Sequence, residues 1–163
     1  MSEYHLAQIN IAAMRAPLDT PIMADFVASL AEINAHADAA SGFVWRLKSD
    51  QDNATAFRVF ESDRLIINMS VWESIDALFE YTYRSQHIDV YRRRADWFEK
   101  MDTPHMALWW LPAGTLPIPQ DAKTRLAYMQ EHGATPFAFT FKARFTPDEL
   151  IAYAQTHPIA VPE

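Results

Sequence analysis

Cysteine is absent from the 163-residue chain, and glycine is scarce, with three residues at Gly42, Gly114 and Gly133. Without cysteine there is no disulfide scaffold, no thiolate nucleophile and no cysteine-ligated zinc or iron–sulfur site. Three isolated glycines cannot form a glycine-rich phosphate loop, so the P-loop and Rossmann fingerprints are missing as well. These absences exclude thiol chemistry and the commonest nucleotide-binding loops.

The chain has no excess of positive charge: it contains 14 Lys and Arg residues and 21 Asp and Glu residues, which gives a formal charge of −7. A nucleic-acid partner is therefore not expected, because phosphate binding needs a basic surface. No apolar run approaches the about 20 residues that cross a bilayer, and the N-terminal residues do not resemble a signal peptide. We expect a soluble, cytoplasmic protein without a membrane partner.

The hydrophobic content is high, with 50% hydrophobic and 13% aromatic residues, which is typical of a folded chain. The length suits one domain with a sizeable core. We expect a single domain over residues 1–163, with a core from about 5 to 112 and a C-terminal extension from 113 to 163.

Hydrophobic periodicity and turn residues predict the order of the elements. Strands are expected at 5–12, 43–47, 55–60, 65–72 and 106–111, and helices at 21–40, 75–83 and 86–101. A polar turn is expected at 49–53. In the extension, a helix at 121–132 precedes a strand at 137–145, and a capping box of Thr146 and Glu149 opens a terminal helix.

This order indicates an α+β fold of the ferredoxin-like split βαβ type, with an antiparallel sheet and a C-terminal helix–strand extension. A sheet of this type carries helices on one face only. A second copy of the chain is the simplest cover for the other face, so we expect a homodimer.

Polar side chains share one face of the predicted sheet, because the side-chain period of a strand is two. Gln8 and Asn10 lie on this face of the first strand, and Asn68 and Ser70 lie on it in a central strand. Buried amides and hydroxyls without partners cost about 1–3 kcal/mol each, and a ligand or ordered water would supply those partners. The alternatives are a solvated face or a polar network inside a dimer interface.

Two further residues extend this face. Trp72 continues the alternation of Asn68 and Ser70, and Arg46 joins from the second strand. We expect Gln8, Arg46, Ser70 and Trp72 to bind a small apolar or aromatic ligand.

The predicted helix at 86–101 carries a stripe of His87, Tyr91, Arg94 and Phe98 at i, i+4 and i, i+7 spacing. We expect His87 and Arg94 to face the core or its rim. Histidine titrates near neutral pH and can act as a general base, and arginine can pair a ligand carboxylate. The alternatives are a structural histidine and an arginine paired with an internal Asp or Glu.

The neighbouring arginines have a simpler explanation. Arg93 and Arg92 stand at i, i+4 spacing from Asp89 and Asp96 respectively, which predicts exposed helix pairs. None of the six histidines forms an HxH or HExxH pattern, so no metal site made by the protein alone is expected.

The run Val71-Trp72-Glu73-Ser74, an amphipathic helix and then Ser85-Gln86-His87 is similar to the dimeric α/β barrel superfamily, which includes the antibiotic-biosynthesis-monooxygenase-like proteins. From about Leu6 to Phe141 the chain resembles one bacterial family of that superfamily that carries only a domain-of-unknown-function label. The resemblance implies a homodimer whose two sheets face each other, with a pocket between sheet and helices in each subunit.

Relatives in this superfamily include cofactor-free oxygenases, isomerases and haem-degrading enzymes. In the haem-degrading relatives a helix histidine about one turn beyond the position of His87 binds iron. This chain has Tyr91 or Arg92 there, a departure that argues against haem, although His87 itself could reach an iron.

The first functional hypothesis is a cofactor-independent monooxygenase or isomerase that acts on an aromatic or polyketide-like substrate. Asn10, Asn68 and His87 are its catalytic candidates, because they would hydrogen-bond an enolate or phenolate oxygen. Tyr91 and Arg94 are further ligand-binding candidates. The alternatives are a non-catalytic ligand-binding protein, a haem-binding or haem-degrading protein, and a structural dimer with a filled interface.

Overall fold

The structure is a computed structural model that describes residues 3–48, 60, 62–84 and 87–158. Its strands are β1 (Tyr4–Met14), β2 (Phe43–Arg46), β3 (Leu65–Trp72), β4 (Phe98–Glu99) and β5 (Met106–Pro112). Its helices are η1 (Pro21–Met23), α1 (Ala24–Ala39), α2 (Ile75–Arg84), α3 (His87–Arg92), α4 (Arg94–Trp97), α5 (Pro119–His132) and α6 (Pro147–Thr156). The predicted turn at 49–53, and the predicted strand at 55–60 up to residue 59, lie outside the described residues.

The sheet confirms the predicted fold class. Every named strand pair is antiparallel, and the strands run in the order β2-β3-β1, with β5 and then β4 paired to β1. Strand β5 pairs along Tyr4 to Asn10, and β4 pairs with Ala13 and Met14. The order β2-β3-β1-β5, with helices between β1 and β2 and between β3 and β5, is the ferredoxin-like split βαβ arrangement.

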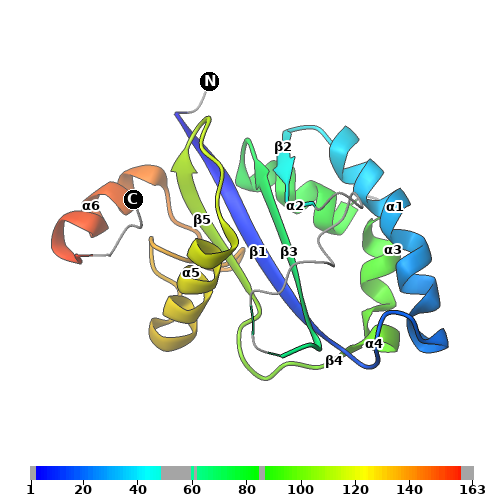
Figure 1. The fold of residues 1–163 in the computed structure, drawn as a ribbon. Helices are drawn as coiled ribbons and strands as arrows, with labels where there is room; N and C mark the ends of the chain where they lie inside the picture. Colours follow the sequence, from blue (N-terminus) through cyan, green and yellow to red (C-terminus); the bar gives the residue numbers. More distant parts are fainter. Residues whose placement is uncertain (1–2, 49–59, 61, 85–86, 159–163) are drawn as a thin grey trace.

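One face of the sheet is a continuous apolar core. It buries alternate residues of the long strands, which follow from the period of two: Ala7, Ile9, Ile11, Ile67, Met69, Val71, Ala107 and Trp109. Helix α5 packs on this face through Ala122, Leu126 and Met129. Figure 1 shows α5 on the opposite side of the sheet from α1 and α3. The face that we expected a second copy to cover therefore carries the chain's own extension.

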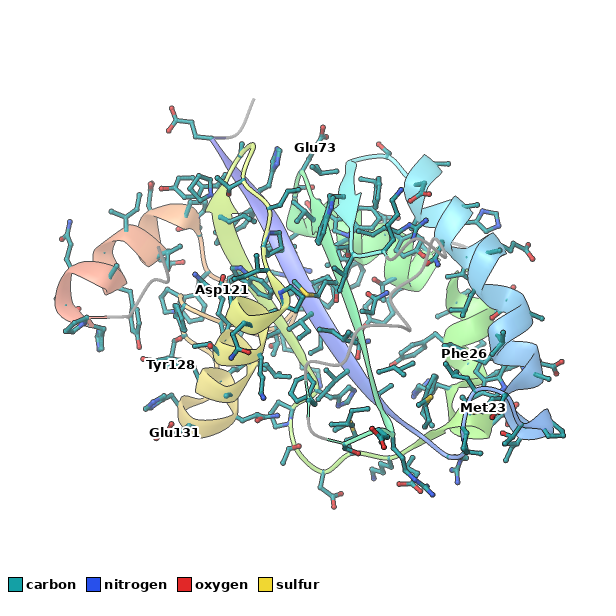
Figure 2. All side chains as sticks on the ribbon, in the orientation of Figure 1. Met23, Phe26, Glu73, Asp121, Tyr128 and Glu131 are labelled. Atoms are coloured by element: carbon teal, nitrogen blue, oxygen red, sulfur yellow. The ribbon has the colours of Figure 1, made fainter. Side chains whose placement is uncertain are left out.

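Helix α1 and the segment around α4 form a separate apolar cluster on the other side. Met23, Phe26 and Trp97 pack there with Met14 of β1. Figure 2 labels Met23 and Phe26 at the N-terminal end of α1, far from Asp121 and Tyr128 of α5. The helical segment begins at Pro21, as predicted, with Thr20 as N-cap, although the first turn is the 3-10 helix η1.

The predicted helix at 86–101 is wrong in its second half. The chain leaves helical geometry at Arg93 and again at Phe98, which is extended. Phe98 and Glu99 form β4 and pair with the end of β1, so sheet pairing overrides the helical periodicity. The predicted i, i+4 ion pairs are replaced as well, since Arg93 pairs with Asp96 and with Asp25 of α1.

The extension keeps its predicted helices but not its predicted strand. Thr146 and Glu149 form both hydrogen bonds of the capping box at the start of α6. In place of a strand at 137–145, Phe139 alone exchanges two backbone hydrogen bonds with Leu108 of β5. The chain then turns, and Phe141 and Phe145 pack beside Trp72 and Trp110 in a second apolar cluster. The extension thus passes from the α5 face around the β5 edge to the other face.

Gly42 fixes the approach of α2 to the end of α1. Its φ is +81°, a conformation that other residues rarely adopt. A Cβ at this position would lie 2.5 Å from the Cβ of Ala77. Ser74 caps α2, because its Oγ accepts a hydrogen bond from the Ala77 N–H at 3.1 Å.

Candidate functional site

The predicted polar residues lie in the middle of the sheet face that α1 and α2 cover. In the β1–β3 register, Leu6 lies opposite Trp72, Gln8 opposite Ser70, and Asn10 opposite Asn68. Leu6 and Trp72 belong to one apolar cluster, and Met14 at the far end of β1 belongs to another. A polar band therefore lies between two apolar clusters on the same face.

A hydrogen-bond network connects this band. The Gln8 Nε2 donates to the Asn68 Oδ1 at 2.6 Å and to the Ser70 Oγ at 2.9 Å. The Ser70 Oγ also accepts a hydrogen bond from the Trp72 Nε1 at 2.8 Å. Because indole N–H is only a donor, Trp72 fixes Ser70 as an acceptor on that side.

Ser70 consequently has a donor left over. Its Oγ accepts from two N–H groups, which occupies both lone pairs, so its O–H must donate to a third group. Among the described residues Ser70 makes hydrogen bonds only as an acceptor. The Nδ2 of Asn68 and the carboxamide of Asn10 likewise have no partner within the described part of the chain. The band thus offers a cluster of hydrogen-bond donors.

These donors face a narrow cleft of about 90 Å³. The sheet side is lined by Gln8, Asn10, Arg46, Asn68, Ser70 and Trp72. Helices α1 and α2 supply the opposite wall, through Ile33, Asn34, Ala37, Leu78, Tyr81 and Thr82. Met106 of β5 and Phe141 of the extension complete the lining. The polar band therefore lines a cleft, with Gln8 and Ser70 buried and Asn10 and Asn68 exposed.

Arg46 reaches the cleft as part of an ion pair. Its Nε and Nη2 donate to the two carboxylate oxygens of Asp38 at 2.7 and 3.2 Å. The arginine side chain is 6% exposed, whereas that of Asp38 is 44% exposed. The two-point geometry orients the guanidinium firmly and compensates its charge locally. Arg46 thus contributes a neutralised pair to the cleft.

Tyr81 covers the ring of Trp72. Their ring centroids are 5.1 Å apart with 29° between the planes, a stacked arrangement, and Phe43 meets Trp72 edge-on at 5.5 Å. The Tyr81 hydroxyl donates to the Ile33 carbonyl of α1 at 3.2 Å. Burial raises the pKa of Tyr81 to about 12, and Arg46 opposes part of that rise. Trp72 itself is 1% exposed, so little of its indole is open to the cleft.

Tyr91 and Arg94, predicted as ligand-binding residues, are not among the described residues that line the cleft. Arg94 is exposed rather than core-facing, because its guanidinium lies 4.0 Å from the ring centroid of Tyr91 and donates to the Tyr91 carbonyl at 2.9 Å. Tyr91 meets the ring of Tyr83. His87 begins α3, which packs against α1 and α2, but its side chain lies outside the described residues.

Sequence reasoning missed the helix side of the cleft. Tyr81 follows the buried Leu78 by three positions, a spacing that places both on one face of α2. That signal was sufficient to assign Tyr81 to the inner face. The contribution of Phe141 had no comparable signal, because it depends on how the extension crosses the edge of β5.

The described lining contains only two titratable groups, Arg46 and Tyr81. Neither is a base at neutral pH, because one is a paired guanidinium and the other is a phenol whose pKa is raised to about 12. Among the described residues no group of three or more His, Asp or Glu side chains could hold a metal ion. None of the described helices is long and apolar enough to cross a membrane.

A family model described as a domain of unknown function, DUF3291, matches residues 5–155. The chain belongs to this family. No curated protein matches the chain. The family match confirms the expected domain-of-unknown-function membership.

Solved structures with a similar fold include SnoaB, a cofactor-independent oxygenase from Streptomyces nogalater. It is 15% identical with a TM-score of 0.44, over 72% of this chain and 100% of that chain. A protein of unknown function from Nitrosomonas europaea is 13% identical with a TM-score of 0.43, over 72% and 96% of the two chains. Rv0793 from Mycobacterium tuberculosis is 16% identical with a TM-score of 0.42, over 70% and 97%.

Proposed function

We propose that this chain is a small-molecule-binding protein, and that its cleft takes an aromatic compound with a hydrogen-bond-accepting oxygen. The polar band that lies between two apolar clusters carries this proposal. Ser70 is buried, and a buried donor without a partner costs about 1–3 kcal/mol, so its O–H favours a ligand oxygen or water. Asn10 and Asn68 are exposed and add donors on the open side of the cleft. The apolar walls, with Leu78, Met106 and Phe141, suit an aromatic body.

The direction of the hydrogen bonds suggests which end of the ligand lies at the polar band. The Ser70 O–H and the Asn68 Nδ2 are donors, and the carboxamide of Asn10 lies beside Asn68 in the register. A carbonyl, phenolate or enolate oxygen would accept from these groups. Rotating the carboxamides of Gln8 and Asn68 by 180° would reverse the network and present acceptors instead, so the ligand's own polarity can select one of two arrangements.

A second candidate is the enzyme hypothesis, a cofactor-independent monooxygenase or isomerase. The same donors support it, because preorganised donors stabilise an enolate or phenolate as it forms. Proton removal then needs a base. Because the described lining holds no base at neutral pH, His87 is the residue on which this candidate depends.

The binding proposal is tested with 2-naphthol and with naphthalene, which lacks the oxygen, by isothermal titration calorimetry. We expect 2-naphthol to bind the wild type about tenfold more tightly, which corresponds to about 1.4 kcal/mol. Asn68→Ala should remove most of that preference. Gln130→Ala is the matched control, since this exposed amide of α5 bonds to the Pro104 carbonyl away from the cleft. An unchanged preference in Asn68→Ala would overturn the proposal.

The catalytic candidate and the haem alternative need separate measurements. His87→Ala should abolish deuterium exchange at the enolisable position of 2-tetralone without weakening its binding; equal exchange in both proteins would contradict a catalytic His87.

Mixing the protein with haemin and recording the Soret band tests the haem alternative, and the binding proposal expects no shift.

Assembly remains a prediction. We propose a homodimer, but its interface must use a surface other than the sheet face that α5 occupies. Light scattering coupled to size exclusion distinguishes a mass near the 18.7 kDa of one chain from twice that value.

A further inference from the structure

The polar network of the cleft uses every N–H of the Gln8 side chain. The Gln8 Nε2 donates to the Asn68 Oδ1 at 2.6 Å and to the Ser70 Oγ at 2.9 Å, and the Trp72 Nε1 donates to the same Ser70 Oγ at 2.8 Å. The Ser70 O–H and the Asn68 Nδ2 are then left to face a ligand. We call this the donor arrangement, because it presents two donors to the cleft.

The same atoms also form an acceptor arrangement. A carboxamide carries its oxygen and its nitrogen at nearly equivalent positions, so turning Gln8 and Asn68 by 180° exchanges acceptor and donor without moving the backbone. The Gln8 Oε1 then accepts from the Ser70 O–H and from the Asn68 Nδ2, while Ser70 still accepts from Trp72. Each arrangement contains three internal hydrogen bonds, and the acceptor arrangement leaves no O–H of Ser70 over. It presents the Asn68 Oδ1 to the cleft.

The neighbours of Gln8 do not fix its carboxamide in one orientation. Among the described residues its hydrogen bonds are those to Asn68 and Ser70, and its partner across β5 is the apolar Leu108. An indole N–H only donates, so Trp72 occupies one lone pair of Ser70 in both arrangements. The choice is therefore confined to the carboxamides of Gln8 and Asn68.

We infer that Gln8 is the specificity-determining residue of the cleft, and that by turning its carboxamide it admits aromatic N–H donors, such as indoles, as well as acceptor ligands. The inference rests on the proposed function, because it concerns the same cleft. The equal number of internal hydrogen bonds makes the two arrangements similar in energy, so one hydrogen bond to the ligand is enough to select between them. Asn68 is the exposed member of the network and lines the cleft, so the change of polarity meets the ligand there.

Indole and 1-methylindole test the acceptor arrangement, because they share a ring system and only indole has an N–H. We expect the wild type to bind indole about fivefold more tightly in isothermal titration calorimetry, although 1-methylindole has more apolar surface to bury. Asn68→Ala should reduce this ratio to about one or below. A cleft fixed in the donor arrangement would set its donors against the indole N–H and would bind 1-methylindole at least as tightly.

Nuclear Overhauser effects report the orientation of Gln8 directly. In the donor arrangement the Gln8 amide and the Trp72 indole N–H donate to the same Ser70 Oγ, which brings their protons close together. We expect a cross-peak between these protons in the complex with quinoline, which only accepts. The cross-peak should be lost in the complex with indole.

Gln8→Glu is the matched variant, since a carboxylate has the shape of the carboxamide but only accepts. At pH 8 it imposes the acceptor arrangement, so quinoline should bind about tenfold more weakly than to the wild type, while indole and naphthalene stay within about twofold. Ser70→Ala removes the outward O–H without adding a charge and should weaken quinoline alone in the same way, which keeps the test available if Gln8→Glu folds poorly. Gln130→Ala, outside the cleft, should change none of these affinities. Equal weakening of all three compounds in both cleft variants would overturn the inference.

The outcomes separate the turning of Gln8 from the proposed function. Preferences for indole over 1-methylindole and for 2-naphthol over naphthalene, with the cross-peak lost only in the indole complex, support both. No preference for indole, or a cross-peak that persists with it, overturns the turning of Gln8; the binding proposal still stands if the preference for 2-naphthol is lost in Asn68→Ala. A preference for indole with loss of the cross-peak, but none for 2-naphthol, supports the turning of Gln8 and overturns the proposed acceptor ligand. No binding of any of these compounds overturns both.

Discussion

The two faces of the sheet are made by the same strands and are filled in opposite ways. On one face Ala7, Ile9 and Ile11 meet α5 in an unbroken apolar core. On the other face Gln8 and Asn10 separate two apolar clusters beneath α1 and α2. Because neighbouring residues of a strand point to opposite faces, β1 carries both patterns within the five residues from Ala7 to Ile11. We interpret the first face as the stabilising one and the second as the ligand-binding one.

Among the described residues, each face also buries one arginine, and the two are held differently. Arg46, on the cleft side, makes a two-point pair with Asp38 at 2.7 and 3.2 Å. Arg125, on the α5 side, lies 3.6 Å from Asp121, donates to the Phe137 carbonyl at 2.9 Å, and lies against the Phe137 ring. Burial lowers the pKa of Arg125 from its usual value. The α5 side thus packs its charge among rings, whereas the cleft side orients its charge with a carboxylate.

The largest expected effect is on the apolar face. Leu126→Ala should lower the free energy of unfolding by about 3 kcal/mol, because Leu126 is 1% exposed and its truncation leaves a cavity between α5 and the sheet. Urea denaturation followed by circular dichroism measures this loss. Leu116→Ala, at a position 55% exposed, is the control and should change the value by less than about 0.5 kcal/mol. Equal losses in the two variants would contradict α5 as the core cover.

On the polar face, the largest expected loss comes from Ser70→Ala. It leaves the indole N–H of the buried Trp72 without its acceptor, which should cost about 2 kcal/mol. In a Trp72→Phe background the same substitution should cost at least about 1 kcal/mol less, because the orphaned donor is gone. A double-mutant cycle by urea denaturation measures the difference, and an additive result would remove Trp72 from the network.

Alkaline pH distinguishes two tyrosines on opposite sides of the sheet. The pKa values of Tyr81 and Tyr128 are both raised to about 12, the first mainly by burial and the second mainly by its hydrogen bond to Tyr153. A tyrosine whose pKa is higher in the folded chain stabilises the fold below pH 10 and loses that contribution as the pH rises from 10 to 12. Stability should therefore fall over this range in the wild type.

The two tyrosines should respond to different substitutions. Tyr81→Phe should reduce the loss of unfolding free energy between pH 9 and pH 11 by about 1 kcal/mol. Tyr153→Phe should lower the pKa of Tyr128 and leave that of Tyr81 unchanged, as followed by absorbance at 295 nm. A Tyr81 titration that shifts with Tyr153→Phe would show that burial is not its main cause.

The strands of this sheet were predictable because the type of residue alternates along each strand between its two faces. The range 65–72 for β3 is correct to the residue, and Gln8, Asn10, Asn68 and Ser70 share a face as the period of two requires. The cap signals at Ser74 and Thr146 were also readable, because each is a local hydrogen bond between near neighbours.

The features that could not be predicted depend on contacts between distant residues. The sequence of residues 94–99 contains no signal that Phe98 pairs with Met14. This pairing ends the helix that the hydrophobic periodicity predicts. The α5 sequence indicates a helix but not the face that it covers. The Asp38–Arg46 pair and the contribution of Phe141 to the cleft likewise follow from the fold and not from spacing.

The substitution with the smallest expected change in stability on the polar face gives the sharpest test of the difference between the two sheet faces. Gln8→Leu would extend the apolar cluster at Leu6 across the polar band, and Ser70 would still accept from Trp72. Asn68 lies at the exposed side of the network and can bond to water in place of Gln8. The lost hydrogen bonds and the gained apolar contact should nearly offset each other, so the free energy of unfolding should change by less than about 1 kcal/mol. The preference for 2-naphthol over naphthalene should nevertheless fall to near unity. If Gln8→Leu instead destabilises the chain as much as Leu126→Ala does, the polar band is a structural network, and the two faces differ in composition but not in role.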